Sequence, residues 1–408
     1  MHVVFVEPRF PANQKRFVFA LRDVGAAVSA VGEAPPEALG GDLRDALAAY
    51  EQVGSVCDEG AVQEAVKRIM KRGWVDRLEA TVEAHILPIA RVRARCGIPG
   101  TSEETAFLCR DKPAMKEALR AAGVPTARSI GTDSADEVRA FAREVGFPII
   151  LKPRAAAGAS GTFKASDAAG LERAIRDSYL DRGASVAAEE FIEGHEGFYD
   201  TLTLGGKVVH EFASHYYPNV LEAMRERWIS PQIITTNRLS AEGYGELREL
   251  GAKVIGALGI GTSATHMEWF YGPKGPKFSE IGCRPPGVCV WDVYSAANDL
   301  DVYREWASLV ARGRPSGTPS RRYAGGMINL RPDRDGRIAG YENEREVFQR
   351  LGEWLIDAHL PAPGTPTQPV EAGYMANAWL RLKHPDYDEL RRIMTWVGET
   401  LRVRARPA

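Results

Sequence analysis

One stretch of the sequence, residues 260–287, limits what this chain can fold into more than any other. It reads IGTSATHMEWFYGPKGPKFSEIGCRPPG, with apolar and polar residues alternating on both sides of the turn sequence YGPKGP. This pattern predicts a β-hairpin. If the hairpin is symmetric about Lys274, Glu268 lies opposite Glu280, and the two side chains share one face of the sheet.

The two opposed glutamates require a positive charge nearby. Directly paired positions place their Cβ atoms roughly 5 Å apart, and two like charges at that distance destabilise a sheet. Mg²⁺ takes oxygen ligands at about 2.1 Å and commonly uses one or two carboxylates together with nucleotide phosphates. Arg284, four residues after Glu280, is placed to hold a phosphate or carboxylate beside such a metal. The alternative is that Glu268 and Glu280 are solvated on an exposed sheet face, because charged residues lie mostly on surfaces.

Length and composition set the class of protein. A chain of 408 residues is long for one average domain, so we expect two or three. The hydrophobic content of 44% and the charged content of 26% are ordinary for a globular protein. The formal net charge of -2 gives no support for a nucleic-acid or membrane-surface partner, whereas small polar or anionic ligands remain open.

The cysteines and the first residues indicate the compartment. The 5 cysteines include no C-x-x-C pair, so neither a disulfide framework nor a zinc site is expected. Met1 leads directly into a short apolar run, without a basic leader region or an apolar run of transmembrane length. We therefore expect a cytoplasmic protein with reduced thiols and no membrane partner.

The first hundred residues predict an α/β domain. Two apolar runs, His2 to Val6 and Ala27 to Val31, flank a helical pattern, which is typical of the opening of a parallel sheet. The first turn carries no G-x-G-x-x-G, so a dinucleotide site of that kind is not supported. Helical patterns continue to residue 96, and the domain is expected to close near residue 100.

Two lysines occupy positions that favour an anionic ligand. Asp111 is the predicted N-cap of a helix that ends at Gly123, and Lys112 sits in its first turn, where a cation opposes the helix dipole. Lys152 ends the apolar strand that closes a second β-α-β unit, and ligands gather beyond the carboxyl ends of strands. The alternative for Lys112 is a solvated surface lysine.

A loop rich in small residues follows Lys152. Residues 154–162 read RAAAGASGT, so the backbone N–H groups can approach and wrap phosphate oxygens. The loop lacks G-K-[ST] and is not a P-loop. Its candidate contacts are Gly158, Ser160 and Gly161, and its alternative role is that of a flexible turn.

An acidic strand provides candidates for binding a nucleoside. Residues 185–196 read SVAAEEFIEGHE, and three of the four glutamates, Glu189, Glu190 and Glu196, are the candidates in and just after a strand. Carboxylates accept hydrogen bonds from an adenine amine or from ribose hydroxyls. The backbone from Glu190 to Ile192 can supply the N–H and C=O groups that read an adenine edge.

Taken in order, these motifs resemble the ATP-grasp superfamily, and most closely its carboxylate-amine ligases, the branch that includes the L-amino-acid (dipeptide) ligases. The resemblance covers residues 100–310 well and reaches the C-terminal part only loosely. It implies an α/β (α+β) protein with an ATP-grasp fold. The implied domains are a Rossmann-like pre-ATP-grasp domain over 1–100, an ATP-grasp domain over 101–312 with lobes 101–195 and 196–312, and a small C-terminal α+β module over 313–408.

The resemblance also implies an ATP site. The implied phosphate contacts are Lys112, Lys152 and the loop residues Gly158, Ser160 and Gly161. Glu189 is implied as the acceptor for the adenine amine and Glu196 as the ribose contact. The implied adenine-reading segment consists of Glu190, Phe191 and Ile192.

The metal and catalytic roles follow from the same resemblance. Glu268 and Glu280 match the family's Mg²⁺ carboxylates, which also accept Mn²⁺, and Arg284 matches the arginine that steadies the acyl phosphate, beside Lys152. His266 matches a histidine common two positions before the first metal carboxylate, where it acts either as a base or as a structural hydrogen-bonding group. Gly282 departs from the pattern, because many members have an asparagine there. Either water fills that coordination site or the second metal binds weakly.

The resemblance implies an ATP-dependent ligase that activates a carboxylate as an acyl phosphate and passes it to an amine. Its substrates would be a small carboxylate and an amine, amino acids among them, and homodimers are common in the family. One alternative is a biotin-carboxylase-like or purine-pathway ATP-grasp enzyme. Another is a regulatory protein that binds ATP without turnover, which Gly282 would permit. Aromatic candidates for an acceptor pocket are Tyr216, Tyr217, Trp228, Trp269 and Trp291.

Overall fold

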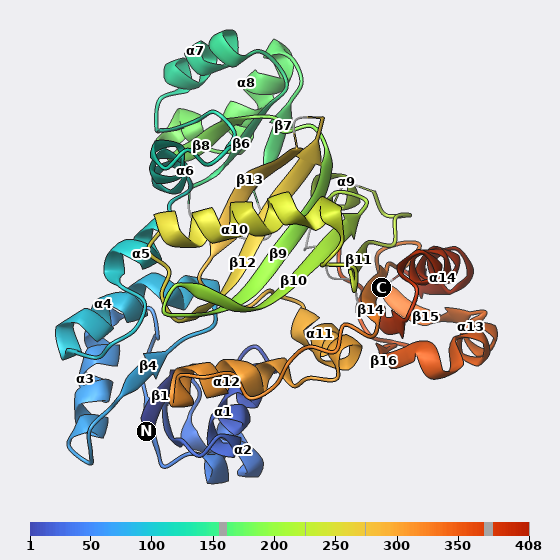
Figure 1. Cartoon of the computed structure of the whole chain (residues 1–408). Helices are drawn as coiled ribbons and strands as arrows, with labels where there is room; N and C mark the ends of the chain where they lie inside the picture. The colour runs from blue at the N-terminus through green and yellow to red at the C-terminus, as the bar shows by residue number, and fades with distance from the viewer. Residues whose placement is uncertain (155–160, 225, 274, 371–377, 408) are drawn as a thin grey trace.

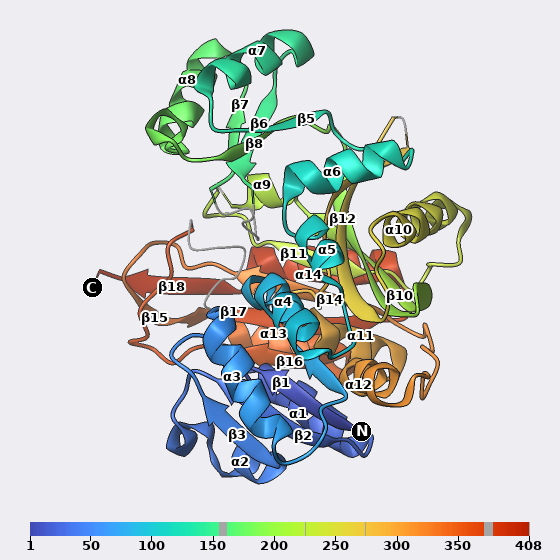
Figure 2. The ribbon, with the colours of Figure 1, turned by 90° about the vertical axis from the view of Figure 1, so that its left-hand side faces the viewer.

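The structure is a computed structural model that describes residues 1–154, 161–224, 226–273, 275–370 and 378–407. Gly158 and Ser160 of the candidate phosphate loop therefore lie outside the described residues. Figures 1 and 2 show a small lobe at one end of the molecule, an N-terminal domain at the other, and a large sheet between them. In the described ranges, each helix is too short or too polar to cross a membrane.

The N-terminal domain is built on a parallel sheet, as its sequence predicts. Strand β1 (His2–Val6) pairs in parallel with β2 (Ala27–Gly32) on one side and with β4 (Arg77–Glu79) on the other. The strand order is β3-β2-β1-β4, so the chain direction across the sheet reverses between β1 and β4. The remaining elements are β3 (Ala49–Gln52), α1 (Gln14–Asp23), α2 (Gly41–Ala46), α3 (Glu59–Met70) and α4 (Ile86–Cys96).

The small lobe has a four-stranded sheet in the order β5-β8-β6-β7. Its strands are β5 (Ser129–Thr132), β6 (Ile149–Pro153), β7 (Phe163–Ala165) and β8 (Val186–Glu190). The prediction of a simple β-α-β unit here is wrong in one respect, because β8 returns between β5 and β6 and pairs antiparallel with both. The helices are α5 (Glu103–Leu108), α6 (Lys112–Ala121), α7 (Ala135–Val145) and α8 (Ala168–Asp177).

The two faces of the small sheet have different roles. Leu151 and Ala188 pair with each other and lie in the core beneath α7 and α8. Because side chains alternate along a strand, their neighbours Lys152 and Glu189 face the opposite way, toward the large lobe. The sequence pattern thus places charged groups on the open face. Helix α6 begins as predicted, since the Asp111 side chain accepts a hydrogen bond from the Ala114 N–H.

The large sheet has eight strands in the order β13-β12-β9-β10-β11-β14-β17-β16. Strands β14, β16 and β17 belong to the expected C-terminal module, but they extend this large sheet and do not form a separate sheet. The domain boundary at residue 312 stays a prediction. The strands are β9 (His195–Leu204), β10 (Lys207–Tyr217), β11 (Gln232–Thr235), β12 (Ser263–Gly272), β13 (Gly275–Gly282), β14 (Ala324–Leu330), β16 (Leu355–His359) and β17 (Ala378–His384).

The remaining elements cover this sheet or close the C-terminal part. A two-stranded ladder of β15 and β18 lies beside the C-terminal helices. The elements are α9 (Val220–Ala223), α10 (Gly245–Ala257), α11 (Val290–Asn298), α12 (Val302–Arg312), β15 (Arg337–Glu342), α13 (Glu344–Leu351), α14 (Tyr387–Thr400) and β18 (Arg402–Arg406).

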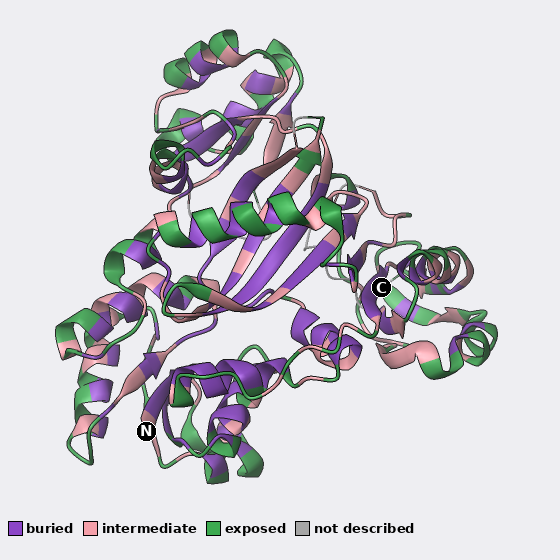
Figure 3. Cartoon of the chain, in the orientation of Figure 1, coloured by how far each residue is buried: buried purple, intermediate pink, exposed green. Residues whose placement is uncertain are grey.

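Helix α10 covers one face of the large sheet, and the other face is only partly covered. Figure 1 shows α10 lying across the strands, and Met267 and Ile281 are buried beneath it. On the opposite face, Leu202 and Ala264 pack in the core that α11 and α12 share with the N-terminal domain. Figure 3 shows how much of the strands is buried and how exposed the outer side of α10 is. Beyond α11 and α12, the second face lines a cavity.

The predicted hairpin is present, with one irregularity. Glu268 pairs with Glu280, as expected from the sequence, and His266 pairs with Gly282. Nearer the turn, however, Trp269 pairs with Phe278, one position away from symmetry about Lys274. A β-bulge at Ser279 absorbs the extra residue and restores the register of the glutamate pair. Such bulges often re-aim a side chain beside a functional site.

Candidate active site

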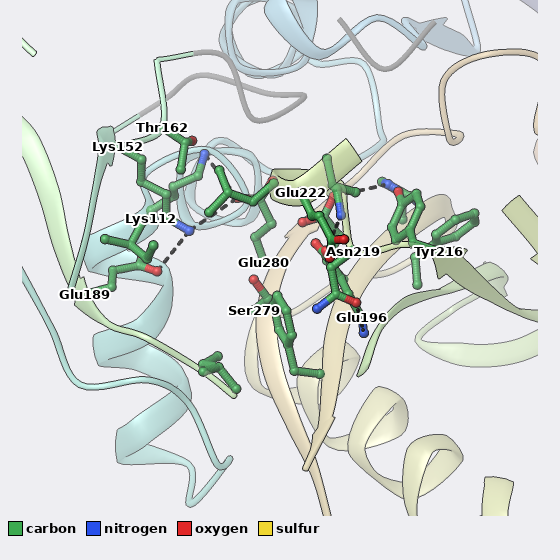
Figure 4. A pocket seen from close by; sticks show the side chains of 18 of the residues that line it. Lys112, Lys152, Thr162, Glu189, Glu196, Tyr216, Asn219, Glu222, Ser279 and Glu280 are labelled. Carbon is green, nitrogen blue, oxygen red and sulfur yellow. Dashed lines mark hydrogen bonds and ion pairs between the residues drawn. The ribbon is translucent and has the colours of Figure 1, made fainter. Parts of the chain in front are cut away.

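A cavity of about 590 Å³ lies between the small lobe and the open face of the large sheet. Figure 4 shows Lys112, Lys152 and Glu189 on one side of it and Glu196 on the other, with Glu280 between them. Thr162 also lines the cavity, whereas Gly161, one residue earlier, does not. The predicted residues that line it are Lys112, Lys152, Glu189, Glu190, Phe191, Ile192, Glu196, His266, Glu268, Glu280 and Arg284.

Two lysines of the small lobe converge on Glu280. The Lys112 ammonium lies 3.3 Å from the Glu280 Oε2 atom, and the Lys152 ammonium lies 3.8 Å from the same oxygen. Burial raises the pKa of Glu280, but Lys112 and Lys152 outweigh burial and lower this pKa to about 2. Glu280 is therefore a carboxylate at neutral pH. A cluster of two lysines in a cavity is the arrangement expected for binding phosphates.

A third lysine, Lys116, was missed by sequence reasoning. Its ammonium lies 2.5 Å from Glu189 Oε1, and Lys152 lies 2.9 Å from Glu189 Oε2. Both Glu189 oxygens are thus engaged by lysines, so the structure gives this carboxylate a partner other than the expected adenine amine. Burial lowers the pKa of Lys116 to about 8 despite Glu189. The sequence could have indicated Lys116, because it lies four residues after Lys112 and therefore on the same face of α6.

The opposed glutamates have different charges. Burial raises the pKa of Glu268 to about 8, and the neighbouring carboxylates Glu280 and Glu196 add to the effect. Glu268 therefore carries a proton at neutral pH unless a cation lies between it and Glu280. This pair fits a divalent metal because both carboxylates line one cavity. Among the described residues, no group of three or more His, Cys, Asp or Glu is arranged as a metal site, so bound phosphates would have to complete the ligand shell.

The orientation of His266 is fixed by Asp200. His266 Nδ1 donates to Asp200 Oδ1 at 2.7 Å, and the Tyr294 hydroxyl donates to Asp200 Oδ2 at 2.5 Å. The neutral imidazole then has its lone pair on Nε2, which lies 3.9 Å from Glu268 Oε1 at the cavity. Asp200 and Tyr294 were missed because they lie far from His266 in sequence.

Two backbone N–H groups of the predicted adenine-reading segment are hydrogen-bonded within the protein. The backbone N–H of Glu190 donates to the Arg128 carbonyl at 2.9 Å, and that of Phe191 donates to the Pro148 carbonyl at 3.2 Å. Among the described residues, the Ile192 N–H has no backbone hydrogen-bond partner, unlike the other two N–H groups of this segment. The Glu190 carboxylate pairs with Lys277 at 2.9 Å.

Glu196 lies at the far side of the cavity. Its Oε2 atom accepts a hydrogen bond from the Val220 N–H at 2.6 Å, and its own N–H donates to Asn219 Oδ1 at 3.0 Å. Burial raises the pKa of Glu196 to about 7, since the Val220 bond only partly offsets it and Glu280 adds to the rise. These contacts hold the Glu196 carboxyl group in place at the cavity.

Of the five aromatic candidates for the acceptor pocket, only Tyr216 lines the cavity. Trp269 is buried in the core beneath α10, and Trp291 packs against Phe17 of the N-terminal domain. Trp228 is 77% exposed. Further apolar residues that line the cavity are mainly aliphatic, namely Phe198, Val220, Leu221, Ile233, Val288 and Val290.

Arg284 lines the cavity where β13 ends, beside Pro286. Its Nε atom donates to Glu83 of the N-terminal domain at 2.5 Å. Arg110 donates to the other Glu83 oxygen at 2.8 Å. Glu83 was missed by sequence reasoning because it is separated from Arg284 by 201 residues.

A protein-family model matches part of this chain. Residues 111–195 match the model described as "Carbamoyl-phosphate synthase L chain, ATP binding domain". This segment contains the two predicted phosphate lysines, Lys112 and Lys152, and it ends just before Glu196.

Two curated relatives from Bacillus carry names of amino-acid ligases. The "L-arginine-specific L-amino acid ligase" of Bacillus subtilis is 29% identical over 276 residues, covering 62% of this chain and 64% of the relative. The "Alanine--anticapsin ligase" of Bacillus subtilis (strain 168) is 26% identical over 235 residues, covering 52% of this chain and 48% of the relative. The chain thus spans about half to two thirds of the length of such curated relatives.

Solved structures resemble the whole chain. An L-amino acid ligase from Bacillus licheniformis superposes with a TM-score of 0.77 at 16% identity and covers 99% of this chain and 98% of its own. An N5-carboxyaminoimidazole ribonucleotide synthetase from Thermotoga maritima superposes with a TM-score of 0.70 at 16% identity and covers 99% of each chain. At this level of identity the likeness shows the fold and not the reaction.

Proposed function

Because this chain has the ATP-grasp fold, we propose that it is an ATP-dependent ligase that joins a carboxylate to an amine and releases ADP and phosphate. The observation that carries the proposal is the cavity in which Lys112 and Lys152 of the small lobe meet Glu280 of the large lobe. The match to the ATP-binding domain model and the two Bacillus relatives support the same reading. Amino acids are the proposed substrates.

In the proposed first step, an oxygen of the acid attacks the γ-phosphate of ATP and ADP leaves, giving an acyl phosphate. Catalysis of phosphoryl transfer depends on positioning and on neutralising charge. Lys112 and Lys152 are assigned to the phosphates. Burial lowers the pKa of Lys152, but Glu189 and Glu280 more than offset this and raise it, so the ammonium stays charged.

Glu268 and Glu280 are assigned to Mg²⁺, with Mn²⁺ as a substitute. When bound, such a cation neutralises charge on the nucleotide phosphates. Burial, and then repulsion from Glu280 and Glu196, raise the pKa of Glu268, and such a cation would offset that repulsion. Glu196 is assigned to the ribose hydroxyls and Ile192 to the adenine edge.

In the proposed second step, the amine attacks the acyl carbon and displaces phosphate. His266 Nε2 is assigned to accept the amine proton, because Asp200 holds the Nδ1 proton. Arg284 is assigned to the oxyanion of the tetrahedral intermediate, and losing one such contact typically costs about 3 kcal/mol in the barrier.

The mainly aliphatic residues of the cavity lining, among them Val220, Leu221 and Ile233, are assigned to an amino-acid side chain. We also propose, on the family resemblance alone, that the chain forms a homodimer, which light scattering of the purified protein tests directly.

The proposal is tested by trapping the acyl phosphate. Hydroxylamine competes with the amine and converts an acyl phosphate into a hydroxamate. We expect hydroxamate from one or more amino acids only when ATP and Mg²⁺ are both present. A regulatory ATP-binding protein, the alternative that Gly282 permits, would bind ATP and yield no hydroxamate with any acid.

A further inference from the structure

Glu83 occupies a special place in the N-terminal domain. It opens the short 3-10 turn Glu83–His85 that follows β4, at the carboxyl edge of the parallel sheet. The strand order reverses between β1 and β4, and the crevice at such a reversal is where open α/β sheets bind ligands. In this chain Glu83 projects from that edge to the catalytic hairpin and contacts Arg284.

The Glu83 carboxylate lies between two guanidinium groups. Its Oε2 atom accepts from Arg284 Nε at 2.5 Å, and its Oε1 atom accepts from Arg110 Nη1 at 2.8 Å. The side chains of Glu83 and Arg284 are only 19% and 16% exposed. Burial raises the pKa of Glu83, but Arg284 and Arg110 outweigh burial and lower it. The ion pair is therefore fully charged at neutral pH.

These contacts fix the plane of the Arg284 guanidinium. Its Nη1 atom donates to the Pro285 carbonyl at 2.8 Å, and its Nε atom is held by Glu83. Among the described residues, Nη2 has no hydrogen-bond partner, and Arg284 lines the cavity. Nη2 is thus the nitrogen left for a ligand.

Gly282 lies directly beside this ion pair. A Cβ atom built on Gly282 would lie 2.9 Å from Glu83 Oε2 and 3.4 Å from Arg284 Cγ. Real Cβ atoms essentially never approach another heavy atom so closely, so the Glu83 carboxylate would have to shift. Its hydrogen bonds to Arg284 and Arg110 oppose that shift. The backbone of Gly282 does not have a positive φ angle, so conformational freedom is not the reason for a glycine here. The reason is space.

We infer that Glu83 is a positioning residue that sets the orientation of Arg284, and that position 282 is a glycine because the Glu83 carboxylate takes the space of a side chain there. The inference rests on the proposed role of Arg284 at the oxyanion. On this inference, Gly282 is compatible with an active enzyme, because a side chain at this position would displace Glu83. The glycine therefore does not have to mean a loss of function caused by the missing asparagine. It also makes the N-terminal domain part of the catalytic apparatus.

The kinetic test uses the nearly isosteric change Glu83→Gln, which keeps the shape and removes the charge. We expect kcat to fall about tenfold to a hundredfold, as misplacing a reacting group does, with the KM for ATP unchanged. Glu103→Gln is the matched control, because Glu103 also pairs with an arginine but is exposed and does not line the cavity. An unchanged kcat would overturn the inference, as would a loss confined to the KM for the acid.

A second test measures stability and needs no activity. Gly282→Ala should lower the melting temperature by about 1–3 °C in the wild type and in Glu83→Gln, because both keep a polar side-chain atom beside position 282. In Glu83→Ala the space is open, so Gly282→Ala should cost little. An equal cost in all three backgrounds would overturn the inference.

The two tests separate the possible failures. If no ligase activity is found but the stability effect depends on residue 83, the proposed reaction fails and the spatial link between Glu83 and Gly282 stands. If the enzyme is active but Gly282→Ala costs the same in every background, the inference fails and the proposed reaction stands.

Discussion

Lys112 on α6 of the small lobe lies 3.3 Å from Glu280 on β13 of the large lobe, so one ion pair spans the two walls of the cavity. Both side chains are largely shielded, with side-chain exposures of 8% and 23%. A phosphate placed here would meet the Lys112 ammonium directly, and Glu280 would then need another cation. In the proposed enzyme, this pair would link nucleotide binding to metal binding.

Lys112→Met should weaken ATP binding. The change removes a cation assigned to the phosphates and leaves Glu280 with Lys152 as its remaining nearby lysine partner. We expect the Kd for ATP to rise about tenfold or more, as loss of a charge-assisted contact of 1.5–3 kcal/mol requires. Isothermal titration calorimetry measures this. Lys67→Met, on the exposed face of α3, is the control and should bind ATP normally; an unchanged Kd in Lys112→Met would contradict the assignment.

Glu280→Gln should abolish ATP turnover without unfolding the protein. The amide keeps the shape of the side chain but cannot neutralise a divalent cation. We expect phosphate release to fall below detection, with a circular dichroism spectrum like that of the wild type. Full activity in this variant would remove the metal assignment.

Asp200→Asn should separate the two proposed steps. The asparagine oxygen is neutral, so it accepts a weaker hydrogen bond from the His266 Nδ1–H. The asparagine NH2 group can instead donate to Nδ1, which would move the imidazole proton to Nε2 and leave no lone pair there for the amine proton. We expect hydroxamate formation to persist, since it does not need a base for an amino-acid amine, while amide formation with the natural amine falls about a hundredfold or more. Equal losses in the two assays would mean that His266 is not the base.

The protein should lose stability on mild acidification through a buried histidine pair. His195 Nε2 lies 2.9 Å from His215 Nδ1, and His215 Nε2 lies 2.8 Å from the Tyr244 hydroxyl. Burial lowers the pKa of His215 to about 3, and His195 adds to this effect. Below the ordinary pKa of about 6.5, the unfolded chain binds a proton that the folded chain does not, so the free energy of unfolding falls as pH falls from 6.5 toward 3.

At pH 5 the loss from His215 amounts to roughly 2 kcal/mol relative to pH 7. Urea unfolding at the two pH values measures it, with His215→Gln as the comparison. His215→Gln should be less stable at both pH values, since it loses packing. Its free energy of unfolding should, however, change less between pH 7 and pH 5 than that of the wild type, by about 2 kcal/mol. An equal difference in the two proteins would contradict the assignment.

The sequence predicted local features well where periodicity and capping decide them. The N-cap at Asp111 is present, and the glutamate pair of the hairpin is in the expected register. The pairing of Glu268 with Glu280 nevertheless depends on a bulge at Ser279 that the alternating pattern does not reveal. The turn shifts the strand pairing by one residue from symmetry about Lys274, and the bulge at Ser279 shifts it back by one residue.

Contacts between distant segments were beyond sequence reasoning. Glu83 reaches Arg284, and Asp200 orients His266, only because separate elements meet across the fold. Lys116 shows a different limit, because a lysine within an amphipathic helix is normally read as solvent-exposed, whereas here it is fully buried against Glu189. The aromatic candidates did not identify the cavity lining, since most of them pack in the hydrophobic cores.

The central claim is that this chain uses ATP to join a carboxylate to an amine, and phosphate release across a panel of amino acids, singly and in pairs, tests it most directly. The account predicts release that requires Mg²⁺, ATP and a matched pair, with a product mass equal to the two amino acids less one water. Release that proceeds with bicarbonate or formate instead, or binding of ATP with no release under any combination, would contradict it.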